Sequence, residues 1–268
     1  MNVLVTGANG NLGKIIIAEL SAKGIDVIGA SSHPKSGQRG FDLDFSIPNA
    51  VLANIDTVIH CARGNNYEQL ANDLEFITLC ARNKVRVVYI GSFSSWLLDR
   101  NEYGNYKRAV EDQTLEIGGI VITCGLLFGG GYQGQIHRIG LILRFLPFGI
   151  NFEGAGSQRI TPLKALLEEL ILNSLITPKT GRVILAYAEI LNFNDILSAI
   201  GPRRFFSIRL KRNFLELLLG RIGNRTGYFN SDSLKGIYSN YSKLFAIDSE
   251  DKAESISKDY AEKFVNLV

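Results

Sequence analysis

The stretch that decides the fold of this chain is VLVTGANGNLGK, residues 3–14, which runs from an apolar segment through three glycines into an apolar-periodic helix. Gly7 permits a tight turn after the strand, and Gly10 lets the backbone approach a phosphate without a Cβ in the way. Gly13 allows the helix expected over residues 12–22 to pack closely on the sheet. The unpaired N–H groups and positive dipole end of that helix would then face the phosphates of a dinucleotide.

The size and composition of the chain bound its class. Its 268 residues suffice for one large α/β domain, or for a cofactor domain with a smaller lobe. The 29 Lys and Arg residues exceed the 26 Asp and Glu residues by only three and are scattered, which argues against nucleic acid as a partner. Cys61, Cys80 and Cys124 stand singly in apolar runs without metal-ligand spacing. We therefore expect buried reduced thiols, with neither disulfides nor a metal site.

Two features of the hydropathy pattern bear on where in the cell the protein is located. The sequence begins directly with a core strand, so we expect no signal peptide. No run of 18 or more apolar residues indicates a membrane span. The sequence therefore predicts a cytoplasmic protein with no membrane partner.

Strands and helices alternate through the first half. Apolar runs predict strands over residues 26–30, 55–62 and 85–90, with a helix of regular apolar spacing over 67–83. This alternation predicts an α/β fold with a doubly wound parallel sheet, whose ligands lie beyond the carboxyl ends of the strands. We interpret His60, at the end of one such strand, as a packed histidine rather than a catalytic one.

The end of the second strand is where a dinucleotide fold selects its cofactor. Proteins that bind NAD usually place Asp or Glu there, to accept hydrogen bonds from the adenosine ribose. This chain has Ser31, Ser32 and His33, followed by Lys35 and Arg39. Neutral hydroxyls with cations nearby favour a 2′-phosphate, so the sequence predicts NADP over NAD.

The residues that follow the strand over 85–90 carry chemistry. Tyr103 and Lys107 are four residues apart, which places both side chains on one face of a helix. A cation beside a phenol stabilises the phenolate, and a hydroxyl such as that of Ser92 can hold a substrate oxygen in line. Such groups move a proton at a hydroxyl or carbonyl oxygen while a nicotinamide moves the hydride.

These motifs resemble the extended short-chain dehydrogenase/reductase superfamily, in particular its NAD(P)-dependent epimerase/dehydratase group, which works on nucleotide sugars. The matching segments are TGANGNLG at 6–13, VVYIGS at 87–92 and YGNYKxxxE at 103–111. The resemblance implies a Rossmann-type sheet. It also implies that Tyr103 is the acid/base, that Lys107 binds the nicotinamide ribose and tunes the tyrosine, and that Ser92 orients the substrate oxygen, with Ser94 as the alternative.

The same resemblance implies a set of residues around the dinucleotide, drawn from the glycine loop, the end of the second strand and the ends of later strands. Asn72 would brace the active site. The residues expected to contact the cofactor are Gly7, Asn9, Gly10, Asn11, Leu12, Gly13, Ser31, Ser32, His33, Lys35, Asp42, Leu43, Cys61, Ala62, Arg63, Gly91, Lys107 and Leu126.

Three features depart from the family pattern. The interval from Ser92 to Tyr103 is shorter than in most extended members, and Gly91 and Tyr106 replace positions that are commonly serine. The apolar run over 120–131, expected as one strand ending in glycines, is similar to the segment that closes over the nicotinamide. It has Cys-Gly at 124–125 where the family usually has Arg-Pro.

We expect a Rossmann domain over residues 1–131 and a smaller, mostly helical substrate lobe over 132–268, with some segments returning to the first domain. Arg159 lies in a stretch similar to the family loop in which an arginine meets the substrate diphosphate; the alternative is a surface cation on a tight turn. The pattern further predicts a strand over 182–188, a short helix over 192–200, an apolar helix over 214–219, a basic cluster over 203–212 and closing helices over 231–268.

The sequence thus predicts an NAD(P)-dependent oxidoreductase or epimerase of a nucleotide-activated sugar, acting by 4-keto reduction or epimerisation in surface polysaccharide biosynthesis. NADP favours net reduction, because epimerisation recycles its cofactor. The expected partner is the nucleotide-sugar substrate, and a homodimer is the assembly considered. Two alternatives stay open: a reductase of a non-nucleotide carbonyl, and a non-catalytic NAD(P)-sensing protein.

Overall fold

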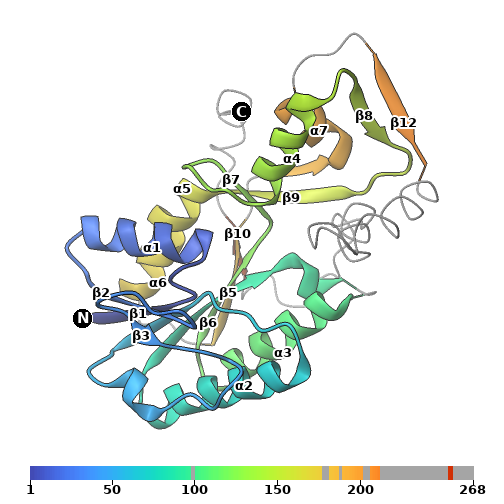
Figure 1. The fold of residues 1–268 in the computed structure, drawn as a ribbon. Helices are drawn as coiled ribbons and strands as arrows, with labels where there is room; N and C mark the ends of the chain where they lie inside the picture. The colour runs from blue at the N-terminus through green and yellow to red at the C-terminus, as the bar shows by residue number, and fades with distance from the viewer. Residues whose placement is uncertain (98–99, 177–180, 187–188, 202–205, 212–252, 256–268) are drawn as a thin grey trace.

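The computed structural model describes residues 1–97, 100–176, 181–186, 189–201, 206–211 and 253–255. An eight-stranded parallel sheet forms the centre of the fold (Figure 1), in the order β13-β10-β6-β5-β4-β1-β2-β3. Its strands are β1 (Asn2–Thr6), β2 (Asp26–Ser31), β3 (Arg39–Gly40), β4 (Thr57–His60), β5 (Arg86–Ser92), β6 (Ile120–Cys124), β10 (Arg182–Ala186) and β13 (Ala253–Ser255).

The strand order reverses between β1 and β4, which are neighbours in the interior of the sheet. Parallel strands ordered in this way leave a crevice at their carboxyl ends, where such sheets bind ligands. The predicted α/β fold with a doubly wound, Rossmann-type sheet is therefore confirmed.

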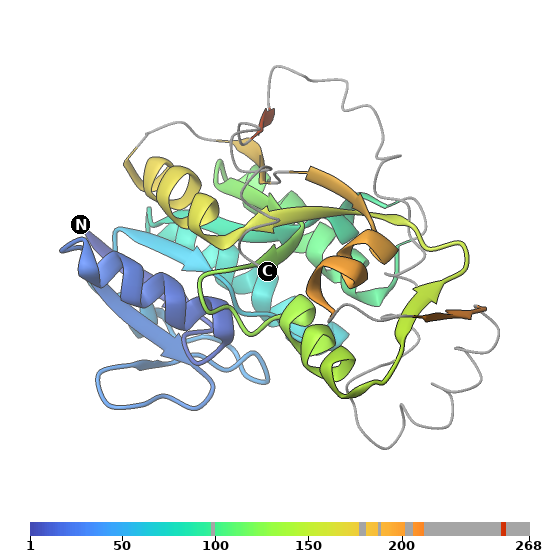
Figure 2. The ribbon, with the colours of Figure 1, turned by 90° about the horizontal axis from the view of Figure 1, so that it is seen from above.

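Helices cover both faces of the sheet (Figure 2). One face carries α1 (Asn11–Ala22) and the run formed by α5 (Leu163–Ala165), the π-helical turn η3 (Leu166–Ile171) and α6 (Leu172–Ile176). The other face carries α2 (Tyr67–Arg82) and α3 (Glu102–Glu116). Strand residues alternate between the two layers: Val3 packs with the first set and Leu4 with the second, and both are fully buried.

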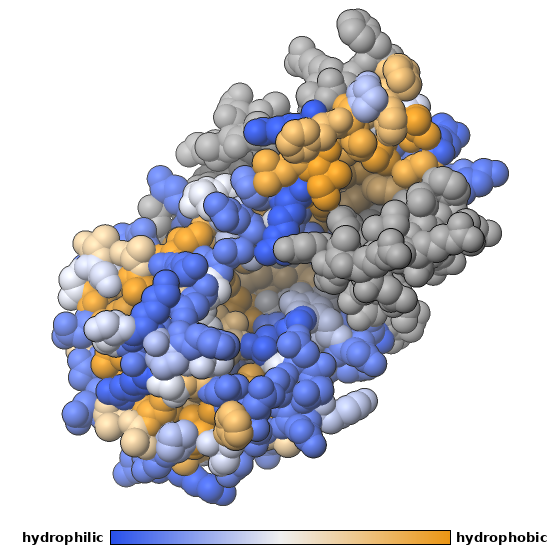
Figure 3. Space-filling model, in the orientation of Figure 1, coloured by the Kyte–Doolittle hydropathy of each residue, from blue (hydrophilic) through white to orange (hydrophobic). Residues whose placement is uncertain are grey.

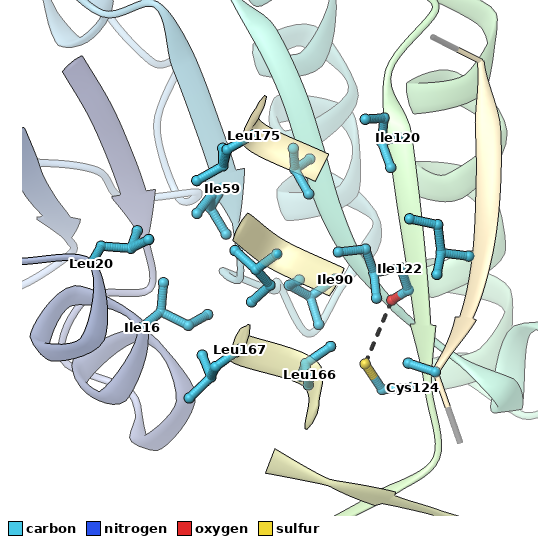
Figure 4. Close-up of a cluster of buried hydrophobic side chains, with 14 of the residues drawn as sticks. Ile16, Leu20, Ile59, Ile90, Ile120, Ile122, Cys124, Leu166, Leu167 and Leu175 are labelled. Atoms are coloured by element: carbon cyan, nitrogen blue, oxygen red, sulfur yellow. Dashed lines mark hydrogen bonds between the residues drawn. The ribbon is translucent and has the colours of Figure 1, made fainter. Parts of the chain in front are cut away.

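The first of these layers forms a continuous apolar core (Figure 4). Ile16 and Leu20 of α1, together with Leu166, Leu167 and Leu175, meet strand side chains that include Ile59, Ile90, Ile120 and Ile122. Burying such side chains stabilises the fold by about 1.5–3 kcal/mol each. The part of the chain after residue 162 therefore contributes directly to the core of the dinucleotide-type sheet.

A smaller lobe has its own core. It consists of β7 (Leu126–Phe128), α4 (Gln135–Phe145), β8 (Gly149–Phe152), β9 (Ser157–Pro162), β11 (Glu189–Asn192), α7 (Phe193–Ile200) and β12 (Ser207–Leu210). Strands β11, β9 and β7 form one sheet, and β12 pairs with β8. Phe128, Ile160 and Phe193 lie buried between these strands and the two helices. No helix within the described ranges is long and apolar enough to cross a membrane.

One predicted strand is wrong in its extent. The run over 120–131 does not continue as one strand: β6 ends at Cys124 in the main sheet, and β7 pairs with β9 in the small lobe. The change occurs at Gly125, where a Cβ would overlap the carbonyl oxygen of Arg159. The predicted helix over 214–219 and nearly all of the tail over 231–268 lie outside the described residues.

Candidate functional site

A cleft of about 900 Å³ opens between the carboxyl ends of the central strands and the small lobe (Figure 3). It is lined by all five residues to which the sequence analysis assigns catalytic or substrate-binding roles: Ser92, Ser94, Tyr103, Lys107 and Arg159. Five residues of the expected cofactor set besides Lys107 line it as well: Leu12, Cys61, Arg63, Gly91 and Leu126. Segments far apart in the sequence therefore converge on one space.

The glycine loop is a close-packed turn. Gly7 has φ +68°, and a Cβ there would lie 3.0 Å from the amide nitrogen of Ala62, two residues after β4. At position 13, a Cβ would overlap the carbonyl oxygen of Gly7 and approach its carbonyl carbon to 2.9 Å. Gly13 is therefore required by contact with the turn itself, rather than by the helix-to-sheet packing expected from the sequence.

The N-terminus of α1 differs from those of the helices on the opposite face. The side chains of Asn66 and Asn101 cap α2 and α3 by accepting hydrogen bonds from Gln69 and Gly104 N–H groups. Helix α1 begins after Gly10, has no side-chain cap and no acidic residue in its first turn. Uncapped N–H groups behind a turn without side chains suit an anionic group. The residues present thus fit the pyrophosphate of a dinucleotide.

Tyr103 and Lys107 lie on α3, one helical turn apart, and both face the cleft. Tyr103 is half-buried, and the guanidinium of Arg63 lies over its ring with Cζ 4.9 Å from the centroid. Lys107 is only 6% exposed; its ammonium donates to the carbonyl of Ile90 at 2.9 Å and lies 4.6 Å from the ring centroid of Tyr89. Within the described part of the chain, no carboxylate lies at ion-pair distance from this ammonium.

A buried carboxylate lies directly behind Ser92. Glu111 Oε1 accepts from the Ser92 N–H at 3.2 Å, and Oε2 lies 2.7 Å from the hydroxyl of Ser95. Burial raises the pKa of Glu111 to about 7, against the opposing hydrogen bonds from Ser95 and Ser92. A Cβ on Gly91 would overlap Oε1, so this chain cannot hold the family's common serine there without moving Glu111.

Sequence reasoning missed a buried polar cluster beneath the cleft. Asp73 on α2 lies 2.7 Å from His60 and accepts a hydrogen bond from the hydroxyl of Tyr106 at 2.6 Å. His60 is fully buried, as expected for a packed histidine, although its partners are polar. The apolar spacing of α2 contains the signal, because Asp73 occupies the same buried stripe as Phe76, Ile77 and Cys80.

The structure corrects the expectation that Arg39 stands beside a 2′-phosphate at the end of β2. Arg39 donates through Nη1 to the carbonyl of Val51 at 2.6 Å and through Nη2 to that of Ala53 at 2.9 Å, so it braces a loop rather than facing a 2′-phosphate. The amide of Asn9 donates to Ser31 Oγ at 2.9 Å and to the carbonyl of His33 at 2.6 Å. These side chains therefore hold the loop together. Lys35 is exposed.

Asn72 does not brace the active site as the resemblance implied. Its side-chain amide donates to the carbonyl of Leu43 at 2.7 Å, on the loop that follows β3. Asp42, on the same loop, accepts a hydrogen bond from the Asp44 N–H at 3.1 Å. Asn72 therefore fixes the segment that carries Asp42 and Leu43, two residues of the expected cofactor set.

The wall formed by the small lobe carries Arg159. It lies on β9, in a strand rather than on a tight turn, and its guanidinium stands over the ring of Phe93 with Cζ 4.8 Å from the centroid. Burial raises the pKa of the Cys61 and Cys124 thiols to about 12, so both stay protonated where they line the cleft. Among the described residues, no three His, Cys, Asp or Glu side chains group as metal ligands.

The first half of the chain is similar to a known protein family. Residues 3–114 match the NAD dependent epimerase/dehydratase family. The matched range runs from β1 through most of α3 and includes the glycine loop, Ser92, Tyr103 and Lys107. The resemblance inferred from the motifs is thereby confirmed.

Solved structures share this fold. The structure titled MoeE5 in complex with UDP-glucose and NAD superimposes with a TM-score of 0.64 at 22% identity, covering 79% of this chain and 85% of that one. The UDP-glucose 4-epimerase of Thermus thermophilus in complex with NAD gives 0.60 at 15% identity, with 79% and 86% covered. The dTDP-glucose 4,6-dehydratase of Bacillus anthracis in complex with NAD gives 0.62 at 14%, with 79% and 84% covered.

Curated relatives are longer than this chain. Uncharacterized proteins of Mycobacterium tuberculosis and Mycobacterium bovis are 26% identical to it over 216 residues. The match covers 75% of this chain and 23% of each relative. The chain therefore spans about a quarter of the length of the curated relatives that it matches.

Proposed function

We propose that this chain binds a nicotinamide dinucleotide and catalyses a redox step at a carbon of a nucleotide-activated sugar, either as net 4-keto reduction or within an epimerisation. The observation that carries the proposal is that Tyr103, Lys107 and Ser92 line one cleft with Leu12, in the first turn of the helix after the glycine loop. This arrangement supports the proposal, because the three side chains and the start of α1 lie within reach of one extended ligand.

Each residue then has a task. A bound nicotinamide supplies hydride transfer at the sugar carbon. Tyr103 gives or takes the proton on the oxygen attached to that carbon, and Ser92 Oγ holds the same oxygen. The buried ammonium of Lys107, on the same face of α3 one helical turn after Tyr103, would bind the nicotinamide ribose. Arg159 offers a planar fork to the substrate diphosphate from the opposite wall.

The proposed substrate class rests on the family and on structural neighbours: MoeE5 was solved with UDP-glucose and with UDP-glucuronic acid, and another neighbour is a dTDP-glucose 4,6-dehydratase. Those neighbours hold NAD. The proposal of NADP for this chain now rests on Lys35 and on the absence of an acidic residue at 31–33, since Arg39 is bound elsewhere. A role in surface polysaccharide formation, a cytoplasmic location and a homodimer stay predictions.

The test combines binding with turnover. The purified chain is titrated with NAD(H) and NADP(H), then incubated with reduced cofactor and a panel of 4-keto nucleotide sugars, and with oxidised cofactor and UDP-glucose. We expect turnover with at least one sugar and a loss of about 10²–10⁴-fold in Tyr103→Phe with an unchanged dinucleotide Kd. Dinucleotide binding with no sugar product anywhere would overturn the enzyme proposal in favour of a sensor.

A further inference from the structure

A series of buried polar side chains, each in contact with the next, begins at the last residue of β1. The hydroxyl oxygen of Thr6 accepts the N–H groups of Cys61 at 3.1 Å and Ala62 at 3.2 Å, and it lies 2.7 Å from Nδ1 of His60. Because both lone pairs of this oxygen are taken by amides, its own proton is donated to Nδ1. This pattern makes Nδ1 the acceptor and leaves Nε2, the nitrogen that faces Asp73, to carry the ring proton.

This series of polar side chains continues through Asp73 to the floor of the cleft. Nε2 of His60 lies 2.7 Å from Asp73 Oδ1, and Oδ2 accepts from the hydroxyl of Tyr106 at 2.6 Å. That hydroxyl in turn accepts the N–H of Gly64 at 2.9 Å. Burial, and then the Asp73 carboxylate, raise the pKa of Tyr106 above its ordinary value, so the hydroxyl stays protonated and donates. Oδ2 of the carboxylate is thus hydrogen-bonded, and Oδ1 lies at ion-pair distance from Nε2 without a hydrogen bond of regular geometry.

The middle of this series of polar side chains is buried away from water. His60 and Asp73 are fully buried and Tyr106 is 7% exposed. The rings of Phe41, Phe76 and Tyr89 surround the imidazole, with ring centroids 5.5–6.0 Å away. A carboxylate in such a setting holds its partners firmly, because no solvent replaces a lost hydrogen bond.

The far end of this series of polar contacts lies next to the proposed catalytic tyrosine. Gly64 lines the cleft, as do its neighbours Arg63 and Asn65. The backbone N–H of Asn65 donates to the side chain of Gln69 on α2. A Cβ on Gly64 would overlap Gln69 and lie 2.9 Å from the hydroxyl of Tyr106, so the segment sits directly on these two side chains. Arg63, held by this segment, covers the ring of Tyr103.

We propose that Asp73 is a positioning residue that couples the two sides of the cleft. Through His60 and Thr6 it fixes the glycine loop against β4; through Tyr106 it fixes residues 63–65, which carry Arg63 over Tyr103. The inference rests on the dinucleotide site and on the role of Tyr103 proposed above. Tyr106 replaces the serine of the family pattern, whose hydroxyl could not extend as far toward α2, so Tyr106 and Asp73 act as a pair.

Two variants and a control test the coupling. Tyr106→Phe removes only the hydroxyl between Asp73 and Gly64, and Asp73→Asn disturbs both arms. Thr123→Val is the control, since the Thr123 hydroxyl is buried and has no hydrogen-bond partner within the described ranges. The measurements are amide hydrogen exchange of the peptide over 61–70, the dinucleotide Kd, kcat with the sugar substrate and the melting temperature.

We expect Tyr106→Phe to speed exchange in this peptide about tenfold, because a buried donor loses its acceptor. It lowers kcat by about two- to fivefold, because its effect reaches Tyr103 through the Arg63 contact. Its dinucleotide Kd stays within about twofold of wild type, since the Thr6 arm is intact. Asp73→Asn also weakens dinucleotide binding about tenfold. Thr123→Val matches wild type throughout.

Unchanged exchange and unchanged kcat in Tyr106→Phe would overturn the inference, as would variants that lose only thermal stability. If Asp73→Asn does not fold, Tyr106→Phe decides alone. Exchange and dinucleotide binding need no sugar substrate. A wild-type chain without turnover would therefore refute the proposed function, while exchange in Tyr106→Phe still decides the link from Asp73 to residues 63–65.

Discussion

The guanidinium of Arg63 lies over the ring of Tyr103, and its Cζ is 4.9 Å from the ring centroid. Arg63 follows β4 and is exposed, whereas Tyr103 lies in the first turn of α3 and is half-buried. A cation on the face of a phenol is attracted by the ring, and by the negative oxygen when the proton leaves. The pair thus joins the end of one strand to the proposed acid/base on a distant helix.

Arg63→Gln should lower turnover about two- to fivefold, because an exposed cation–π contact contributes about 0.5–1 kcal/mol. Arg63→Lys keeps the charge and should lose less. Arg108→Gln is the matched control: it removes an arginine of α3 whose described partner is Asp112, at 2.9 Å. Steady-state kinetics at saturating cofactor would check this, and equal kcat in Arg63→Gln and wild type would contradict a role for the pair.

Gly13→Ala should distort the glycine loop that is proposed to bind the phosphates of the dinucleotide. Alanine gains about 1 kcal/mol over glycine in a helix interior, yet its Cβ would overlap the carbonyl oxygen of Gly7. Overlap with backbone outweighs the gain, so we expect a lower melting temperature and a dinucleotide Kd raised at least about tenfold. The control is Gly40→Ala, where a Cβ meets nothing within 4 Å; calorimetry would measure both variants.

The sheet and the cleft could be predicted from the sequence because they follow from local patterns. Apolar runs that alternate with amphipathic helices specify a parallel sheet, and the spacing of Tyr103 and Lys107 specifies one helix face. The structure accordingly brings Ser92, Tyr103 and Lys107 to one cleft from segments predicted separately.

Long-range polar contacts could not be predicted in this way. The partners of Arg39 are carbonyl groups 12 and 14 residues away, and Asp73 meets Tyr106 across 33 residues. Periodicity reports which face of an element is buried but not which polar group lies opposite. The sequence therefore does not reveal that the Arg39 guanidinium donates to backbone carbonyl groups instead of standing free beside a ligand.

Cofactor preference should respond to Lys35 and not to Arg39. Lys35→Ala removes an exposed cation near the expected 2′-phosphate and should weaken NADP binding about three- to tenfold while sparing NAD. Arg39→Met should leave the NADP to NAD ratio unchanged and destabilise the fold by about 1–3 kcal/mol, because two carbonyl groups lose their donors. Paired titrations and urea unfolding would separate the two effects; a ratio altered by Arg39→Met would restore that residue to the cofactor site.

Glu111 should make stability depend on pH in a direction opposite to that of a salt-bridged carboxylate. The single proton of the Ser95 hydroxyl has two acceptors at 2.7 Å, the carbonyl of Ser92 and Glu111 Oε2. A protonated Glu111 resolves this conflict by donating to Ser95 Oγ, which then donates to Ser92. Burial, the largest influence, raises the pKa of Glu111 to about 7 from 4.5.

The folded state therefore holds a proton that the unfolded chain releases above its own lower pKa. Stability from this group is fully present below pH 4.5 and is lost as pH rises to about 7, a change of about 3 kcal/mol. Glu111→Gln mimics the protonated form, since its amide can donate to Ser95 and accept from Ser92. We expect its free energy of unfolding to exceed that of wild type progressively across this range, with the difference levelling off above about pH 7. Urea unfolding of both proteins in parallel measures the difference, and a gap that stays constant with pH would show that Glu111 is already ionised when folded.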